Sequence, residues 1–277
     1  MVGAKSYPFS VGSSQCAVLL DGTSFLGKER ILKRFPDATE AEYRQAYAEI
    51  RLSLDAADSS FNVLLAKIDS DTILVDTGEG GKPTGGLLHQ SLILAGVEPE
   101  AVTLIVITHC DGDHVLGLLT EDDRAAFANA KFVISKEEMA YWQGRIDREV
   151  PEQQPIVSMM EVKGLRLIEM DERILPGLTA VPLPGHTPGQ IGALIESGNE
   201  KLMVMGDLLH SPIQFAYPEW SASYDIDTSI SVPTRRAALG RVADENMLAL
   251  LYHLTFPGLG RVKRAEKGFT WEPLESR

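Results

Sequence analysis

The chain has 277 residues, of which 44% are hydrophobic and 23% charged, so it contains enough apolar material for a sizeable core. Its 26 basic and 39 acidic residues give a formal net charge of −13. Because an acidic surface repels phosphate backbones, we expect no nucleic-acid partner, and we interpret the short basic run 261–264 as a solvated strand edge.

No stretch reaches the roughly 18 apolar residues that a membrane-spanning helix needs, so we expect no membrane partner. The first residues lack the apolar region of a secretory signal. The two cysteines, Cys16 and Cys110, are too few for a disulfide framework. These observations favour a reduced, cytoplasmic location.

Predicted strands and helices alternate from the N-terminus onward. Apolar runs predict strands at 15–22, 60–69 and 71–78, the last two joined by a tight turn as a hairpin. Thr39 followed by Glu42 resembles a capping box and predicts a helix that begins there. A second helix is predicted at 86–96. The β-branched run 102–108 is apolar on both faces, which is typical of a buried central strand.

The same alternation continues in the second half of the chain. Strands are predicted at 131–135, 178–185, 190–197, 200–207 and 246–253, with helices beginning at 136 and spanning 233–245. No linker rich in proline, glycine or serine interrupts the sequence. The pattern predicts a single α/β domain over residues 1–277, a sandwich in which helices cover two sheets.

Charged and histidine side chains recur where these strands end. Of the six histidines, His89 lies within a helical pattern and His210 just past a strand, and we assign no role to either. The other histidines and two aspartates follow apolar strands directly or in the next turn: Asp76, His109, His114, His186, Asp207 and His253. A single such histidine is usually structural, but loops at one sheet edge converge, and imidazole with carboxylate is a ligand set for divalent metals. The joint pattern therefore indicates a metal site.

Five segments resemble the motifs of the metallo-β-lactamase superfamily, in the family's order. The segment "THCDGDHVLG" (108–117) resembles the THxHxDHxGG motif, and the others are "LVDTG" (74–78), "LPGHTPGQIG" (183–192), "MVMGDLLH" (203–210) and "LYHLTFPGLGRV" (251–262). The chain looks most similar to the branch that contains methyl parathion hydrolase and the acyl-homoserine lactonases. The resemblance implies a four-layer αββα sandwich.

The resemblance also implies a ligand set for two metal ions. One ion would be held by four residues: His109, Asp111, His186 and Asp207. The second would be held by Asp113, His114, His253 and the shared Asp207. Asp76 would support the ligands from behind.

Asp111 stands where the superfamily usually has a histidine. Aspartate is shorter than histidine and adds negative charge and hard-oxygen character. In one interpretation Asp111 ligates the metal, and the first site then prefers iron or manganese over zinc. In the other, its side chain falls short, a water completes the shell, and that metal binds weakly. The superfamily's diiron flavoproteins carry a glutamate at this place, which favours ligation.

The implied activity is metal-dependent hydrolysis, with two divalent ions (zinc, or iron or manganese) as cofactors. A hydroxide between the metals would form near neutral pH, because metals lower the pKa of bound water from ~15.7 to about 7. It would attack the carbonyl or phosphoryl centre of a small ester, lactone or phosphoester. Asp113 and Asp207 are the expected catalytic residues, with Asp113 helping to move a proton to the leaving group.

Two alternatives and one further prediction complete the hypothesis. The carboxylate at 111 also fits a redox-active diiron protein that uses a separate electron donor, and a non-catalytic metal-binding homologue would keep the same fold.

We expect the segment 213–220 to contact substrate through Phe215, Tyr217 and Trp220. The alternative for these aromatics is packing in a lid or between the subunits of a possible homodimer.

Overall fold

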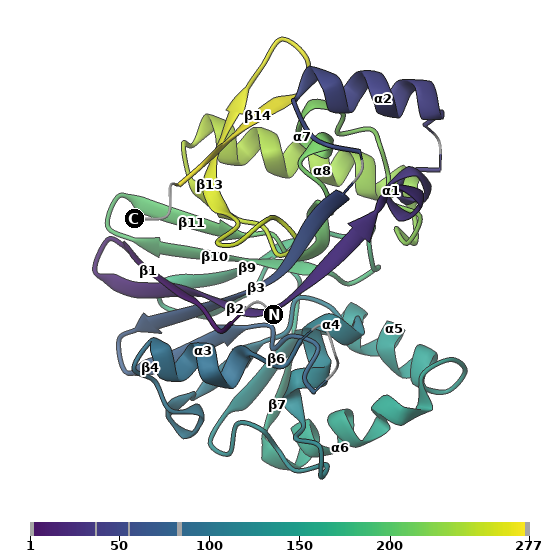
Figure 1. Ribbon diagram of the computed structural model, residues 1–277. Coiled ribbons are helices and arrows are strands. Elements are labelled where there is room, and N and C mark those ends of the chain that lie inside the picture. The colour runs from purple at the N-terminus through teal and green to yellow at the C-terminus, as the bar shows by residue number, and fades with distance from the viewer. Residues whose placement is uncertain (1–2, 37, 55, 82–84, 275–277) are drawn as a thin grey trace.

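The computed structural model describes residues 3–36, 38–54, 56–81 and 85–274. Two seven-stranded sheets pack face to face, and helices cover the outer surface of each sheet (Figure 1). This arrangement is the predicted four-layer αββα sandwich of the α/β class.

The first sheet comes from the N-terminal part of the chain, in the order β1-β2-β3-β4-β5-β6-β7. Neighbours from β1 to β4 pair antiparallel, and those from β4 to β7 pair parallel. The strands are β1 (Ser6–Val11), β2 (Ser14–Gly27), β3 (Ala56–Ile68), β4 (Asp71–Val75), β5 (Leu104–Val106), β6 (Lys131–Ser135) and β7 (Leu165–Ile168).

The second sheet comes from the C-terminal part, in the order β14-β13-β12-β11-β10-β9-β8. Its neighbours pair antiparallel except β11 and β12, which are parallel. The strands are β8 (Arg173–Leu175), β9 (Leu178–Pro182), β10 (Ile191–Ser197), β11 (Glu200–Val204), β12 (Leu248–Leu250), β13 (Leu259–Arg264) and β14 (Phe269–Pro273). The basic run 261–264 lies in β13.

Helices flank both sheets. Figure 1 shows α3, α5 and α6 on the side of the first sheet and α8 on the side of the second. The α-helices are α1 (Lys28–Arg34), α2 (Glu40–Glu49), α3 (Leu88–Leu94), α4 (Gly112–Val115), α5 (Lys136–Ile146), α6 (Gln154–Lys163), α7 (Ile213–Ala216) and α8 (Thr228–Asp244). Short 3₁₀ turns occur at Pro99–Ala101, Leu116–Leu118, Pro151–Gln153 and Gly206–Leu208.

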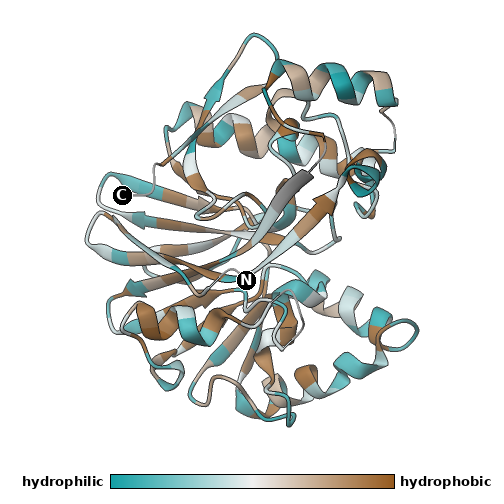
Figure 2. Ribbon diagram, in the orientation of Figure 1, coloured by the Kyte–Doolittle hydropathy of each residue, from teal (hydrophilic) through white to brown (hydrophobic). Residues whose placement is uncertain are grey.

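The main core lies between the two sheets. Val18, Leu64 and Val106 of the first sheet and Ala193 and Leu202 of the second are fully buried there. Hydrophobic residues colour the facing strands brown in Figure 2. Burial of apolar area, at about 25 cal/mol per Å², holds the layers together and gives the strand ends a rigid base.

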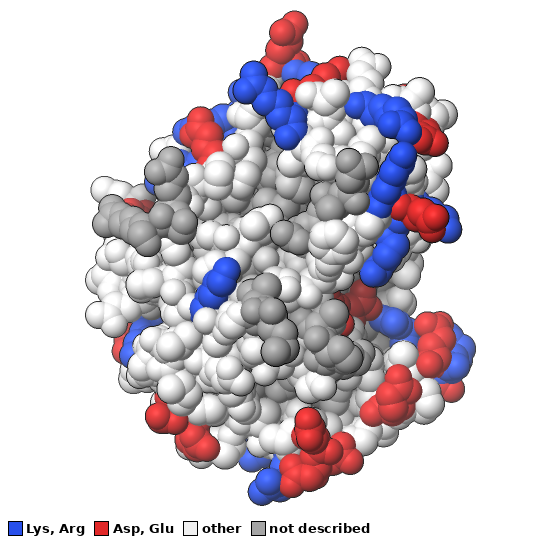
Figure 3. Space-filling model, viewed as in Figure 1, with Lys and Arg blue, Asp and Glu red and all other residues white. Residues whose placement is uncertain are grey.

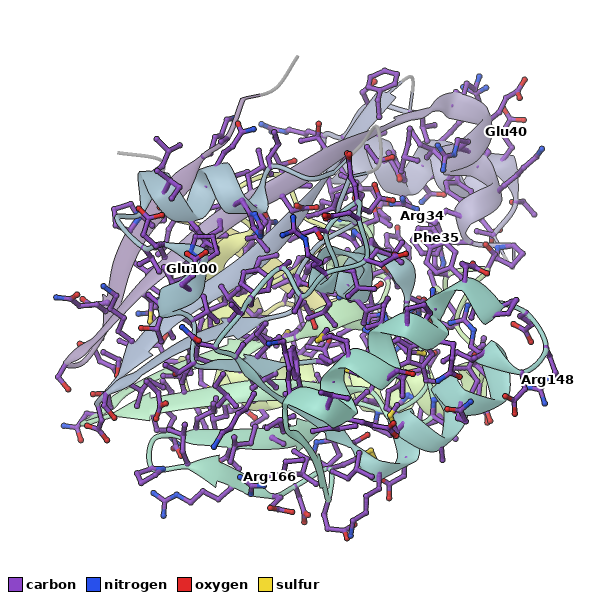
Figure 4. All side chains as sticks on the ribbon, turned by 90° about the horizontal axis from the view of Figure 1, so that it is seen from below. Arg34, Phe35, Glu40, Glu100, Arg148 and Arg166 are labelled. Atoms are coloured by element: carbon purple, nitrogen blue, oxygen red, sulfur yellow. The ribbon has the colours of Figure 1, made fainter. Side chains whose placement is uncertain are left out.

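Helices α1 and α2 form an excursion between β2 and β3 that packs beside α7. Phe35 and Tyr43 are fully buried, and their rings lie 5.7 and 5.2 Å from the ring of Trp220. Figure 4 labels Phe35 next to Arg34 at the end of α1. This aromatic contact fixes α1 beside the loop that follows β11.

Most predicted elements are shorter or longer than those observed; the strand predicted at 102–108, for example, is only β5, and two other differences have clear local causes. The strand predicted at 246–253 is only β12, because Asn246 turns the chain with φ +50° and the residues after Leu250 leave the sheet. The helix predicted from Pro233 begins at Thr228, because Asp227 caps it by accepting a hydrogen bond from the Ser229 amide at 2.9 Å. The proline therefore lies inside the helix.

The surface view in Figure 3 shows acidic and basic side chains interspersed around the edge of one face. Among the described residues, none of the helices combines the length and the hydrophobicity that a membrane-spanning segment requires.

The predicted capping box at the start of α2 is confirmed and can be tested. Thr39 Oγ1 accepts a hydrogen bond from the Glu42 amide at 3.3 Å, and Glu42 accepts one from the Thr39 amide at 2.7 Å. Replacing Thr39 by Ala should lower the free energy of unfolding by about 1 kcal/mol, whereas Thr39→Ser should leave it nearly unchanged because serine is an equally good N-cap. Denaturant titration measures both. Equal stability of Thr39→Ala and the wild type would contradict a stabilising cap.

Candidate metal centre

The strand ends bring the predicted residues to one edge of the sandwich. Parallel strands β4 and β5 lead to Asp76 and to the loop 109–114, and parallel strands β11 and β12 lead to Asp207 and His253. His186 lies in the turn between β9 and β10. Because the carboxyl ends of parallel strands share an edge, residues far apart in sequence meet there.

Asp207 lies at the middle of this group. Its Oδ1 is 3.1 Å from His114 Nε2, and its Oδ2 is 3.1 Å from His253 Nε2. The same Oδ2 lies 3.5 Å from His186 Nε2 and 3.7 Å from His109 Nε2. One carboxylate therefore contacts imidazole groups from both predicted ligand sets.

The donor atoms fit metal ions on two independent grounds. Nε2 of His109, Nε2 of His114 and Oδ1 of Asp207 are buried and have no hydrogen-bond partner among the described residues. Unsatisfied buried polar atoms are costly, and a shared cation would satisfy all three. Moreover, tetrahedral ligands at about 2.0–2.1 Å from zinc lie about 3.3 Å apart, which is close to the separations around Asp207.

Asp113 completes a second cluster on the β12 side. Its Oδ2 lies 3.8 Å from His114 Nε2 and 3.5 Å from His253 Nε2. The Tyr252 hydroxyl donates to the Asp113 backbone carbonyl and so links the two loops. The described residues that could share an ion form three groups, His109–His186–Asp207, Asp113–His114–His253 and Asp207–His210–His253, and the first two match the predicted ligand sets.

The carboxylates of the cluster stabilise positive charge on a neighbouring imidazole. Burial opposes a charged His114, but Asp207, Asp76 and Asp113 outweigh it and raise the pKa of His114 well above its ordinary value. Burial instead lowers the pKa of His109 well below its ordinary value, so this imidazole stays neutral. Because imidazole binds metal in its neutral form, an ion at this site would displace the proton from His114.

Asp76 orients the loop that carries His109 and His114. Its Oδ2 lies 2.8 Å from His114 Nδ1 and accepts a hydrogen bond from the Thr108 hydroxyl at 2.8 Å, while Oδ1 accepts from the Thr108 amide. The Thr108 hydroxyl lies in turn 3.0 Å from His109 Nδ1. These contacts turn the Nε2 atoms of both histidines inward, as expected for outer-shell support of metal ligands.

A comparable support for His186 has no signal in the sequence motifs. Asp225 Oδ1 lies 3.2 Å from His186 Nδ1, and Asp225 Oδ2 accepts from Arg235 Nη2 and the Ser231 hydroxyl at 2.8 and 2.9 Å. Arg235 is fully buried and also donates to the Leu208 carbonyl at 2.8 Å. This pair therefore joins α8 to both the His186 turn and the Asp207 loop.

Glu138 is a second buried residue that the sequence motifs do not reveal. Its carboxylate accepts from the Cys110 amide at 2.9 Å, the Thr187 hydroxyl at 2.6 Å and the Gly189 amide at 3.2 Å. It thereby ties the loop 109–114 to the turn that carries His186.

Asp111 faces the first cluster with one oxygen. Its Oδ2 lies 3.1 Å from His186 Nε2 and 3.8 Å from His109 Nε2, while Oδ1 accepts a hydrogen bond from Arg145. Burial opposes ionisation of Asp111, but His186, His109 and Arg145 outweigh it and hold the pKa of the carboxyl well below its usual range. Asp111 is thus an ionised carboxylate close to two predicted ligands.

His210 is a fifth histidine at the site. Its Nε2 lies 3.0 Å from Asp207 Oδ2, and its ring lies 5.0 Å from that of His186. Its backbone is fixed by Arg34, which donates to the His210 carbonyl, and by Gln214, which accepts from its amide. Its position three residues after Asp207, just beyond β11, is the signal that could have found it.

A cavity of about 300 Å³ opens onto these residues. Its other walls come mainly from β2, α1, β3 and the loop before α8, and its lining includes Leu26, Arg30, Arg34, Phe61 and Tyr224. The aromatics predicted to contact substrate pack elsewhere: Phe215 stacks on Trp271 at 5.2 Å, Tyr217 contacts Trp220 at 4.8 Å, and Trp220 contacts Phe35. These contacts are within the chain, and none of the three aromatics lines this cavity.

Comparison with known proteins identifies the family. Residues 58–253 match the family described as the metallo-beta-lactamase superfamily. The chain belongs to this superfamily. The predicted resemblance is therefore confirmed, and it covers every residue of the two clusters.

Several relatives in this superfamily are hydrolases. A curated N-acyl homoserine lactonase from Bacillus cereus is 28% identical over 162 residues, which are 51% of this chain and 60% of that protein. The match thus spans less than two thirds of that relative. AidC, a dizinc quorum-quenching lactonase solved with an N-acyl-L-homoserine product, is 29% identical with a TM-score of 0.90 over 99% of each chain. AbOPH, a hydrolase of the beta lactamase superfamily, is 26% identical with a TM-score of 0.88, covering 100% of this chain and 99% of that one. These relatives agree with the predicted class, a metal-dependent hydrolase.

The outer-shell role of Asp76 gives a testable expectation. Asp76→Asn removes the charged acceptor beside His114 Nδ1 and should weaken metal affinity by about 10–100-fold. Asp122→Asn, which neutralises an exposed aspartate in the loop between Leu118 and β6, is the control. Metal affinity is measured by competition with a chelator. Equal affinity of the two variants would contradict the role of Asp76.

Proposed function

We propose that this chain is a hydrolase that holds two divalent ions and opens lactones or cleaves related esters. The contact of Asp207 with imidazoles of both ligand groups carries the proposal, because a carboxylate that reaches both groups can offer one oxygen to each of two ions. The lactonase and hydrolase relatives support the choice of substrate class.

The proposed ligands divide between the two clusters. His109, His186 and Asp111 would hold one ion, and Asp113, His114 and His253 would hold the other, with Asp207 between them. We propose zinc as the ion at both positions, because four of these donors are imidazoles. Iron or manganese is the alternative that the carboxylate of Asp111 would favour.

The residues around the ions would have distinct roles in the reaction. When bound, two divalent ions would supply Lewis acidity and a water of lowered pKa. Asp113 lines the cavity with a partly exposed carboxylate, so its Oδ atoms can hold a proton destined for the leaving group. His210 and Tyr224 also line the cavity, with their rings 4.5 Å apart, and would orient the reacting carbonyl.

The cavity also suits the expected product. Hydrolysis of a lactone or ester creates a carboxylate, and Arg30 and Arg34 of α1 both line the cavity. Guanidinium groups bind carboxylates through charge-assisted hydrogen bonds. Leu26 and Phe61 provide an apolar wall for an acyl or alkyl group.

Four further expectations from the sequence remain predictions: a small-molecule substrate, a single domain over 1–277, a possible homodimer and a cytoplasmic location.

Metal removal tests the proposed function directly. Dialysis against a chelator should abolish lactone hydrolysis, and addition of zinc should restore it. The assay panel includes an acyl lactone, an aryl ester and a phosphotriester, so that the substrate class is decided by turnover. Hydrolysis that persists after complete metal removal would refute the proposal, and two bound ions without hydrolysis of any substrate would favour a non-catalytic or redox role.

Asp207 provides the sharpest variant for the same claim. Asp207→Ala should reduce the metal content from two ions per chain to at most one, because both clusters lose a ligand. It should also abolish turnover. Elemental analysis measures the content, and Asp71→Ala, at the opposite end of β4 from the site, is the control. Two ions per chain in Asp207→Ala would contradict a shared carboxylate.

A further inference from the structure

The Asp111 side chain is divided between the metal centre and Arg145. Arg145, from the last turn of α5, donates from Nη1 to Asp111 Oδ1, which leaves Oδ2 directed at His186 and His109. Asp111 is also the N-cap residue of α4, a position where aspartate usually accepts a hydrogen bond from the helix amides. Here it makes no such side-chain bond. Its carboxylate is held toward Arg145 and the cluster instead.

Arg145 is itself held in place. Its guanidinium lies over the ring of Tyr141 at 5.8 Å, and its Nε lies 3.6 Å from a carboxylate oxygen of Glu149. Its side chain is only 20% exposed. A guanidinium fixed on both sides can constrain the rotamer of the carboxylate it binds.

This division determines how many donor atoms Asp111 can offer. With Oδ1 engaged by Arg145, Asp111 contributes one oxygen, and the cluster has four donors: His109 Nε2, His186 Nε2, Asp111 Oδ2 and an oxygen of Asp207. Four donors with two imidazoles suit tetrahedral zinc. A freed Asp111 could offer both oxygens and its full charge, which suits manganese, an ion that prefers more oxygen ligands.

Of the three carboxylates at the centre, Asp111 is the one that pairs with Arg145. In the described part of the chain, the ion pairs of Asp113 and Asp207 are with histidines, whereas Asp111 also pairs with a guanidinium. We propose that Arg145 is a positioning residue that sets metal selectivity: by occupying Asp111 Oδ1, it makes the His109–His186 cluster prefer zinc over manganese. This inference rests on the proposed dinuclear site and adds a determinant of which metal fills it.

The preference for zinc over manganese separates this effect of Arg145 from a general change in metal affinity. Removing the charge of Arg145 changes the attraction for any divalent ion alike, so the ratio of the manganese and zinc dissociation constants cancels that contribution. The ratio is measured by titrating metal-free protein with each ion in competition with a chelator. Arg145→Met should lower the preference for zinc by about tenfold or more, the scale on which outer-shell partners act.

Three further variants make the test specific. Arg148→Met is the matched control, because Arg148 lies exposed in the loop after α5 (Figure 4) and should leave the ratio unchanged. In an Asp111→Asn background, Arg145→Met should change the ratio less than twofold, because the charged carboxylate is gone. Arg145→Gln, also uncharged, should act like Arg145→Met and replaces it if circular dichroism shows that the Met variant does not fold.

The outcomes separate this inference from the proposed function. An unchanged ratio in folded Arg145→Met or Arg145→Gln would overturn the inference, as would an equal change in the Asp111→Asn background or in Arg148→Met. The titration uses no substrate, so failure of the lactone assays leaves its result intact. If the wild type hydrolyses lactones but its ratio of dissociation constants equals that of Arg145→Met, the inference alone is refuted and the proposed function stands.

Discussion

The structure of the site depends on one buried carboxylate. Asp207 is almost fully buried, and five imidazoles approach it: those of His109, His114, His186, His210 and His253. A carboxylate removed from water is stable only when cations or strong donors compensate it. Two divalent ions would meet that requirement and satisfy the buried nitrogens at the same time. The arrangement of loops at the sheet edge therefore serves to bring positive charge to Asp207.

Outer hydrogen bonds explain how these loops keep their geometry. Asp76 holds the first loop through Thr108 and His114, and Asp225 holds His186 through a pair with Arg235. A buried pair of this kind contributes little to stability by itself. Its effect is to fix which imidazole nitrogen faces the centre, and so to prepare the ligands before an ion arrives. Arg145 extends the same principle to a carboxylate, since it selects which oxygen of Asp111 faces inward.

The sequence predicted the layered fold and the strand-end residues, because both follow from local patterns. Alternating apolar runs identify the strands, and a histidine or aspartate directly after a strand must lie at the sheet edge. The supporting residues Glu138, Asp225 and Arg235 could not be predicted this way, because each acts across long sequence separations from within or beside a helix. The early end of β12 and the start of α8 at Thr228 depend on single turns and caps, which apolar periodicity does not report.

The central claim is that two metal ions share Asp207, and anomalous diffraction tests it most directly. Crystals of the zinc-reconstituted protein, measured on both sides of the zinc absorption edge, should show two peaks per chain. Each peak should lie about 2.0–2.2 Å from an oxygen of Asp207, the usual distance between zinc and a carboxylate ligand. A single peak, or two peaks of which one lies out of reach of Asp207, would contradict the account.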